Sequence, residues 1–468
     1  MGQNRKSFII EEIEVLDFAA EGKCIARNEG EVIFINGANV APGDRVKLFV
    51  TKSKKRFSEA TVLNHISFSE NRIKAFCDHF GICGGCKWQH IPYDKQLELK
   101  WQQVFDQFTR ISKVEFPTIL PVFASENTQY YRNKLEYSFS TDRWYTREQI
   151  ETGEEFQKNA FGFHAPGRFD KVIEIQHCYL QGSISNEIRN FLRTYVNEKG
   201  FEYYNHRDHV GFMRSMMLRS SASGFMVVIQ FAQERFDEIH ELLAVLKQNF
   251  PAITSLNYII NQKKNDTFFD LPVQTFSGDN YIYEEMESLK FKVNVKSFYQ
   301  TNSDQAYNLY KITRDYAAIK PTDIVYDLYS GTGTIANFVA KLAQKVVGVE
   351  YVPDAVEDAK SNSVENKINN TVFFAGDMRK ILVTDFFQIH GKPDVIITDP
   401  PRAGMDEPVI NAILNAAPKT IVYVSCNPAT QARDLALLGH QYKVTAVQPV
   451  DMFPHTHHIE NVVKLELR

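Results

Sequence analysis

The chain has 468 residues, of which 44% are apolar and 24% are charged. These proportions exclude a disordered, collagen-like or membrane-spanning protein, and the length predicts two to four domains. The net charge of −4 excludes a protein that coats nucleic acid through bulk charge, although it permits a local basic patch. Because we find no signal peptide and no run of 18 apolar residues, we expect a cytoplasmic protein with no membrane contact.

Residues 1–65 are predicted to form a small OB-like β-barrel. Short apolar runs at Ile13–Leu16, Val32–Ile35 and Val46–Val50 are separated by turn residues, and such spacing is typical of small barrels. Barrels of this kind often hold single-stranded nucleic acid.

Residues 66–290 are predicted to form a mixed α+β middle domain, which begins with clustered cysteines. Cys77, Cys83 and Cys86 lie within ten residues, and Cys178 supplies a fourth thiol. Cytoplasmic thiols stay reduced, so clustered cysteines bind metal more often than they pair. A structural zinc is one interpretation, but zinc sites usually bring two close pairs. Three close ligands and one remote ligand favour a [4Fe–4S] cluster.

Residues 291–468 show a regular alternation of strands and helices, which predicts an α/β domain with a parallel sheet covered on both faces. Two further strands, Val444–Val450 and Val462–Leu467, have no helix between them, which predicts one antiparallel strand at the edge. The expected parallel strands are Ile324–Leu328, Val346–Val349, Val372–Phe374, Val395–Thr398 and Ile421–Ser425.

The turn after the first of these strands suits a bound ligand. Gly331 and Gly333 let the backbone turn sharply and approach a ligand at the N-terminus of the next helix. A dinucleotide-binding turn would carry a third glycine, but position 336 is Ala336.

Four acids, Asp327, Glu350, Asp377 and Asp399, fall at or just after the ends of successive strands. Ligands of open α/β sheets bind outside these carboxyl ends. Glu350 lies 23 positions after Asp327, close to the spacing that serves ribose hydroxyls. An acid-lined pocket suits a nucleoside with a cationic group, so the sequence predicts S-adenosylmethionine rather than NAD.

Cys426 and Glu460 are the candidate nucleophile and base. Cys426 ends the fifth strand just before a helix that Pro428 can start, and a helix N-terminus is expected to lower the pKa of a thiol. Glu460 immediately precedes an apolar strand, where partial burial could raise its pKa to that of a useful general base.

These residues together resemble the uracil-5 RNA methyltransferases, in particular the iron–sulfur type that acts on 23S ribosomal RNA and begins with a TRAM domain. The resemblance implies that Gln300, Tyr329, Glu350 and Asp399 bind S-adenosylmethionine and that the C-terminal domain is a Rossmann-like class I methyltransferase. The motifs that carry it, besides the cysteine cluster, are Phe298-Tyr-Gln300-Thr-Asn302, Asp327-Leu-Tyr-Ser-Gly-Thr-Gly333, Asp399-Pro-Pro-Arg402, Ser425-Cys426-Asn-Pro428 and His458-Ile-Glu460.

The resemblance also implies a reaction and a substrate. Cys426 would add to carbon 6 of a uracil, and Glu460 would remove the carbon 5 proton after methylation. The expected substrate is a uridine of 23S ribosomal RNA, with transfer RNA as the alternative, and the expected state is a monomer. Residues 95–125, which include a predicted helix, would pack on the catalytic domain.

A target base must leave its stack to reach a buried cysteine, and aromatic and cationic side chains can receive it. Arg132, Lys134 and Phe163 combine these types in the middle region, and we expect them to contact RNA. The alternative is a strand with alternating faces.

Two other functions compete with this interpretation. A non-catalytic iron–sulfur protein that binds RNA or senses redox state would need neither Cys426 nor Glu460. A DNA cytosine methyltransferase would share the thiolate chemistry, but it would normally have proline before the nucleophile, where this chain has Ser425.

Overall fold

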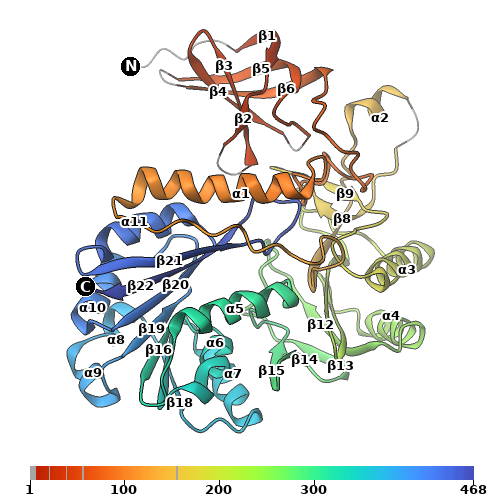
Figure 1. The fold of residues 1–468 in the computed structure, drawn as a ribbon. Coiled ribbons are helices and arrows are strands. Elements are labelled where there is room, and N and C mark those ends of the chain that lie inside the picture. The colour runs from red at the N-terminus through yellow and green to blue at the C-terminus, as the bar shows by residue number, and fades with distance from the viewer. Residues whose placement is uncertain (1–6, 20–21, 38, 55–56, 154–155) are drawn as a thin grey trace.

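The computed structural model describes residues 7–19, 22–37, 39–54, 57–153 and 156–468. The strands in these ranges form four sheets. Figure 1 shows the N-terminal sheet at one end, with helix α1 between it and the C-terminal sheet. No helix among the described residues is long and apolar enough to cross a membrane.

The N-terminal sheet has six strands in the order β1-β5-β6-β4-β3-β2. Strand β5 shows why it folds, because Val46, Leu48 and Val50 alternate with more exposed residues and are fully buried. The strands are β1 (Phe8–Glu14), β2 (Asp17–Phe18), β3 (Cys24–Asn28), β4 (Glu31–Asn36), β5 (Arg45–Ser53) and β6 (Phe57–Ser67).

The middle sheet has seven strands in the order β13-β12-β11-β10-β7-β8-β9. Helices α3 and α4 lie on the side of this sheet that faces away from the C-terminal sheet (Figure 1). A separate hairpin, β14 (Tyr281–Met286) and β15 (Leu289–Asn294), leads into the C-terminal region. The other elements are β7 (Lys134–Ser140), α2 (Arg147–Glu151), β8 (Ala160–His164), β9 (Val172–Glu174), α3 (Ser183–Lys199), β10 (Met213–Ser221), β11 (Gly224–Phe231), α4 (Phe236–Asn249), β12 (Ile253–Ile260) and β13 (Gln274–Gly278).

The C-terminal sheet has seven strands in the order β18-β17-β16-β19-β20-β22-β21. Its first five strands are parallel, as predicted. The strands are β16 (Ile324–Leu328), β17 (Lys345–Glu350), β18 (Thr371–Ala375), β19 (Val395–Thr398), β20 (Thr420–Ser425), β21 (Tyr442–Val450) and β22 (Glu460–Leu467). The helices are α5 (Ser303–Ala317), α6 (Thr334–Val339), α7 (Pro353–Glu365), α8 (Met378–Ile381), α9 (Thr384–His390), α10 (Glu407–Ala416) and α11 (Pro428–Leu438), and Ala340–Leu342 forms a 3₁₀ turn.

The last two strands correct one prediction. The antiparallel strand β22 lies between β20 and β21, so it is one position in from the edge that the sequence predicted. A hairpin satisfies its own pairing in either order, so the periodicity of its strands does not decide which one joins the sheet.

Helix α1 (Tyr93–Gln107) packs against α11 and β21, far from it in sequence. It begins at Tyr93, directly after Pro92, whose non-helical ψ of 142° marks the start of the helix without a side-chain cap. Val104 and Phe108, the latter in a following π-turn (Phe108–Ser112), are completely buried in the same core as the C-terminal sheet.

A buried ion pair joins α1 to the loop between β21 and β22. Lys100 Nζ lies 2.6 Å from Asp451 Oδ1, and both side chains are fully buried. Lys100 also donates to the carbonyl of Phe453 at 3.1 Å, and the Tyr93 hydroxyl donates to Asp451 Oδ2 at 2.9 Å. The loop is therefore fixed from the side of α1.

The cysteine-bearing segment holds the same loop from another side. The amides of Lys87 and Trp88, directly after Cys86, donate to the carbonyl of His455 at 2.8 and 3.0 Å. The hydroxyl of Tyr131 donates to the carbonyl of Pro454 at 3.1 Å. The loop that leads to Glu460 thus depends on contacts from three distant parts of the chain.

Candidate active site

The candidate nucleophile and base meet at one edge of the C-terminal sheet. Cys426 directly follows β20, and Glu460 begins β22. Because β22 runs antiparallel to β20, with Ser425 opposite Asn461, the start of β22 lies beside the end of β20. Asp399 directly follows β19, the neighbour of β20 on its other side.

Burial and neighbouring charges set the protonation of these groups. Burial, together with the nearby carboxylates of Glu460 and Asp399, raises the pKa of Cys426 to about 11, whereas Arg402 acts to lower it. This is opposite to the predicted effect of the helix N-terminus. Burial raises the pKa of Asp399 to about 7. Burial and the charge of Asp399 hold the pKa of Glu460 well above its ordinary value, with Arg402 opposing them.

Arg402 therefore favours the charged forms of both the thiol and the carboxyl group. It is the last residue of the Asp399-Pro-Pro-Arg402 motif, but sequence reasoning gave it no role. Its place three residues after Asp399, at the ligand-binding edge of the sheet, was the available signal.

The glycine turn between β16 and α6 has the conformation that a close-fitting ligand needs. Gly333 has a φ of +72°, and a Cβ there would lie 2.7 Å from the Cβ of Ala359, so a side chain would be strained and crowded. Gly331 has a φ of +51°, and a Cβ there would meet open space. Its amide donates to Glu350 Oε2 at 3.0 Å.

Two buried polar atoms at this turn test the fit of the expected cofactor. Asp327 Oδ1 and Ser330 Oγ have no hydrogen-bond partner among the described residues, while Asp327 Oδ2 accepts from the amide of Ala336 at 2.9 Å. Buried polar atoms are normally paired, so these atoms suit a polar ligand. Together with Glu350 and Asp399 they form an acidic edge that fits a cationic nucleoside such as S-adenosylmethionine.

The remaining predicted cofactor residues occupy different positions around this edge. Tyr329 is half-buried, with a left-handed φ of +63° that is uncommon for a non-glycine residue. Asp377 caps α8, accepts from the amide of Arg379 at 3.0 Å and pairs with its side chain. Gln300 lies between β15 and α5, and its carbonyl accepts from Asn133 at 2.9 Å.

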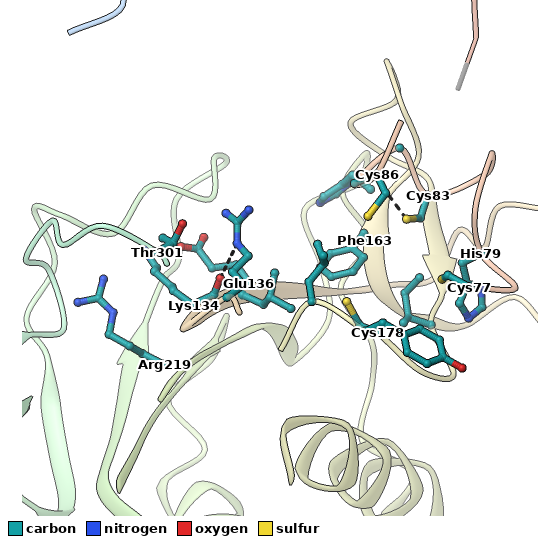
Figure 2. Close-up of a pocket in the computed structure, with 18 of the residues that line it drawn as sticks. Cys77, His79, Cys83, Cys86, Lys134, Glu136, Phe163, Cys178, Arg219 and Thr301 are labelled. Carbon is teal, nitrogen blue, oxygen red and sulfur yellow. Dashed lines mark hydrogen bonds and ion pairs between the residues drawn. The ribbon is translucent and has the colours of Figure 1, made fainter. Parts of the chain in front are cut away.

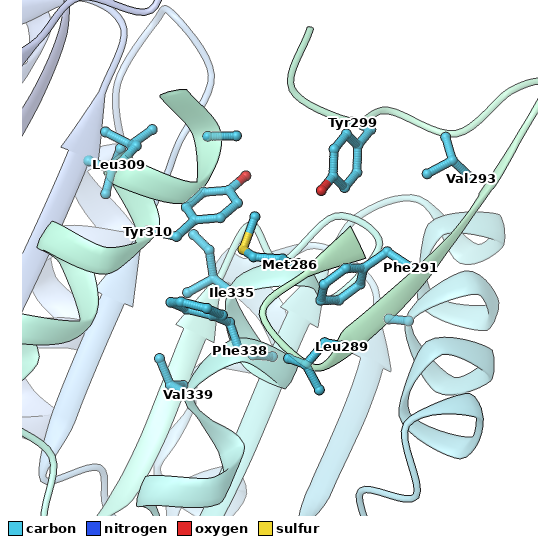
Figure 3. Close-up of a cluster of buried hydrophobic side chains, with 14 of the residues drawn as sticks. Met286, Leu289, Phe291, Val293, Tyr299, Leu309, Tyr310, Ile335, Phe338 and Val339 are labelled. Atoms are coloured by element: carbon cyan, nitrogen blue, oxygen red, sulfur yellow. The ribbon is translucent and has the colours of Figure 1, made fainter. Parts of the chain in front are cut away.

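Tyr310 of α5 is a site residue that the sequence did not reveal. It is buried, its hydroxyl hydrogen-bonds Gln300, and the charge of Asp399 adds to burial in raising its pKa. Figure 3 shows the hydroxyl ends of Tyr299 and Tyr310 turned toward each other beside the hydrophobic cluster that contains Met286. Helix α5 was not predicted, so no periodicity pointed to this side chain.

The four clustered cysteines line one cavity of about 650 Å³, together with Arg132, Lys134 and Phe163. Figure 2 shows the thiols gathered at one end of this cavity. Burial raises the pKa of all four thiols. Among the described residues, no three thiols lie within 4.8 Å of one another; the three ligand groups that come so close are His164, His206 and Asp266.

The expected RNA contacts line the same cavity as the thiols. The guanidinium of Arg132 lies 6.0 Å from the ring of Phe453, in the loop before Glu460. Lys134 forms an ion pair of 2.8 Å with Glu136. Phe163 stacks on Tyr137, with the ring centres 4.9 Å apart.

Comparison with known proteins identifies the family. Residues 276–468 match the family described as tRNA (Uracil-5-)-methyltransferase, and residues 7–63 match the TRAM domain. A protein named RNA methyltransferase from Bacteroides thetaiotaomicron is 53% identical over 96% of this chain and 100% of its own length. A second protein of that name, from Porphyromonas gingivalis, is 52% identical over 97% of this chain and 99% of its own length.

This chain belongs to the uracil-5 RNA methyltransferase family. It is similar to the crystal structure of Pyrococcus abyssi tRNA (uracil-54, C5)-methyltransferase in complex with S-adenosyl-L-homocysteine, with 26% identity and a TM-score of 0.73 over 97% of this chain and 99% of the other. The protein is thus an S-adenosylmethionine-dependent enzyme that methylates carbon 5 of uracil in RNA, with an N-terminal TRAM domain.

Replacing Arg402 with glutamine is expected to slow methylation and to move its pH dependence upward. The variant loses a charge that lowers the pKa of Cys426, and each rise of one in that pKa reduces the thiolate fraction about tenfold at lower pH. We expect kcat/KM, measured from about pH 6 to pH 10, to rise with pH in both proteins and to stay lower in Arg402→Gln.

Arg402→Lys is the matched control, because it keeps the charge at this position. Its profile should lie between those of the wild type and Arg402→Gln. Superimposable profiles for the wild type and Arg402→Gln would contradict the role given to Arg402.

Proposed function

We propose that this enzyme methylates carbon 5 of a uridine in 23S ribosomal RNA, with Cys426 as the nucleophile and Glu460 as the base. The observation that carries the proposal is the pairing of β20 with β22, which brings these two residues to the acidic edge of the sheet. A protein that only binds RNA needs neither a thiol nor a carboxyl group at this position.

The residue types match the chemical difficulty of the reaction. Carbon 5 of uracil is too weakly nucleophilic to accept a methyl group unaided. The Cys426 thiolate adds to carbon 6, and the electron density that this moves into the ring makes carbon 5 a nucleophile. S-adenosylmethionine supplies the methyl group from its sulfonium. Glu460 then takes the carbon 5 proton, and the Cys426–carbon 6 bond breaks to restore the uracil ring.

The raised pKa values indicate when these groups become active. With a pKa of about 11, the thiol of Cys426 keeps its proton at neutral pH, and burial holds the pKa of the Glu460 carboxyl group well above its ordinary value. Both are easier to deprotonate when a cation lies at the same edge, because a nearby positive charge favours the thiolate and the carboxylate. The acidic pocket thus couples cofactor binding to activation of the nucleophile.

Two features support ribosomal RNA as the substrate. The four clustered cysteines and the N-terminal TRAM domain are the combination that the resemblance associates with the ribosomal enzymes. We propose that the TRAM domain forms an OB-like RNA-binding barrel over residues 1–65, that the middle domain spans residues 66–290 with residues 95–125 serving the catalytic domain, and that residues 291–468 form the catalytic domain. Transfer RNA is the second candidate, favoured by the similarity to the Pyrococcus abyssi enzyme.

We also propose that Cys77, Cys83, Cys86 and Cys178 bind a [4Fe–4S] cluster. Tetrahedral zinc has Zn–S bonds of about 2.3 Å, which would bring the sulfur atoms to about 3.8 Å from one another. As a set these thiols are spaced more widely, since among the described residues no three of them lie within 4.8 Å of one another. A four-iron cluster holds its ligand sulfurs further apart and fits such an arrangement. The chain segment that carries Cys77, Cys83 and Cys86 also supports the loop before Glu460, because the two amides that follow Cys86 donate to that loop.

Substitution of the two catalytic residues should have different effects. Cys426→Ala is expected to lower methylation at least about a thousandfold, because no adduct forms. Glu460→Gln is expected to accumulate a covalent RNA–protein adduct, because the carbon 5 proton stays in place and Cys426 cannot leave. Denaturing gels of each variant with S-adenosylmethionine and ribosomal RNA from a strain lacking the enzyme provide the measurement.

Cys24→Ala is the control for this experiment, because Cys24 is buried in the core of the N-terminal sheet, where its thiol donates to the carbonyl of Val40. It should methylate at the wild-type rate. Full activity of Cys426→Ala would overturn the assignment of the nucleophile.

The metal can be identified by anaerobic purification. The wild type is expected to be brown, with about four irons and four sulfides per chain, and Cys178→Ser should lose most of this iron. Cys24→Ser should retain it, because Cys24 lies outside the cavity. A colourless wild-type protein with one zinc per chain would contradict the cluster.

A further inference from the structure

Arg219 is a buried cation whose hydrogen-bonding capacity is largely unused. It lies on β10 and is only 2% exposed. One nitrogen, Nη2, donates to the carbonyl of Ser297 at 3.1 Å. Nε and Nη1 have no hydrogen-bond partner among the described residues. The carboxylates of Glu284 and Glu136 act on Arg219 through their charge but accept no hydrogen bond from it. Burying a guanidinium with unpaired N–H groups costs free energy of folding unless a ligand supplies the missing hydrogen-bond acceptors.

Its nearest neighbour on the sheet adds to this cost. Arg219 lies directly opposite Lys134 in the pairing of β10 with β7, and like charges in such positions destabilise a sheet. Lys134 has Glu136 as its ion-pair partner, so Glu136 is shared between two cations and compensates the charge of Arg219 only in part. Burial raises the pKa of the neighbouring Glu284 to about 7, which leaves that acid only partly charged at neutral pH.

Both cations line the cavity that also contains the four cysteines. Its lining includes four basic side chains, Arg132, Lys134, Arg219 and Lys296, and a single carboxylate, Glu136. Such a concentration of positive charge is unusual in a chain with a net charge of −4. Figure 2 shows Arg219 and the cysteines at opposite ends of the cavity, with Lys134 and Phe163 between them. A group bound by the thiols would therefore leave Arg219 without a partner.

We propose that Arg219 binds a backbone phosphate of the RNA substrate, with Lys134 beside it. A phosphate offers two acceptor oxygens to the planar fork of the guanidinium, and it supplies the charge that the site lacks. In the free enzyme, Nη2 is held by the carbonyl of Ser297, beside the 71% exposed ring of Phe298. When the contact between Nη2 and the Ser297 carbonyl is released, the guanidinium is free to turn toward the cavity. RNA binding is therefore coupled to movement of the segment around Ser297.

The role of Arg219 rests on the proposed function in that the substrate is RNA, but it does not depend on whether ribosomal or transfer RNA is methylated. The site lies in the middle sheet, whereas Cys426 and Glu460 lie at the edge of the C-terminal sheet. Arg219 therefore contributes to affinity and positioning rather than to the chemical step. Because it contacts phosphate and not a base edge, it should strengthen binding of all single-stranded RNA alike.

Arg219→Met tests the proposal through RNA affinity and its salt dependence. The probe is a fluorescently labelled single-stranded RNA oligonucleotide, titrated with the full chain from about 50 to 200 mM salt. We expect binding to weaken about tenfold, and the slope of log K against log salt to become shallower by about 0.7, the contribution of one single-strand phosphate. S-adenosylmethionine should bind as tightly as it does to the wild type.

Thermal unfolding distinguishes this role from a structural one. Arg219→Met removes a buried charge with two unpaired nitrogen atoms, so its melting temperature should equal or exceed that of the wild type although RNA binding is weaker. Arg219→Lys keeps the charge without the fork, and it should retain the wild-type salt slope with intermediate affinity. Arg147→Met is the matched control, since Arg147 is exposed in the same region and pairs with Glu151; it should bind RNA normally.

Three results would overturn the proposal. The first is unchanged RNA affinity and salt slope in Arg219→Met. The second is a lower melting temperature in both Arg219 variants without weaker RNA binding, which would make the residue structural. The third is tight binding of inorganic phosphate that does not compete with the oligonucleotide, which would make the ligand a free anion. If the wild-type enzyme did not methylate ribosomal RNA, that result would instead contradict the proposed function.

Discussion

The buried ion pair between Lys100 and Asp451 is the constraint on which the catalytic arrangement depends. Taking two charges out of water is costly, and removing either partner would leave the other unpaired, at about 3–5 kcal/mol. The pair fixes the loop between β21 and β22 to helix α1, and that loop ends at Glu460. The segment after Cys86 and the hydroxyl of Tyr131 hold the same loop. Residues distant in sequence thus set the position of Glu460. The cysteine segment therefore has a structural role, although the methylation reaction transfers no electron.

Burial at the sheet edge creates a second constraint. The same desolvation that shapes the pocket raises the pKa values of Asp399, Cys426 and Glu460. Groups whose pKa values are raised in this way release their protons less readily until positive charge enters the pocket. Arg402 provides part of that charge, and a sulfonium cofactor provides the remainder. The middle domain has the opposite character, because its cavity has four cations and one carboxylate. The chain therefore separates an acidic sheet edge from a basic cavity, although its net charge is only −4.

Much of this arrangement could be predicted from the sequence, because parallel strands end at a common edge. Strand–helix alternation alone placed Glu350, Asp399 and Cys426 at that edge. The position of Glu460 required the antiparallel return of β22, and the sequence could not specify which strand of the hairpin pairs with β20. The pKa of Cys426 was predicted to fall, because helix position is visible in a sequence but burial beside two carboxylates is not. Tyr310 and Arg219 went unrecognised, since their roles arise from contacts between distant segments.

Mapping of 5-methyluridine by mass spectrometry in RNA from a strain that lacks the gene tests the central claim most directly. We expect one or more sites in 23S ribosomal RNA to lose the modification while transfer RNA keeps it. The wild-type gene should restore it, and a gene encoding Cys426→Ala should not. Loss from transfer RNA alone would contradict the ribosomal target. Unchanged 5-methyluridine in both RNAs would contradict the account as a whole.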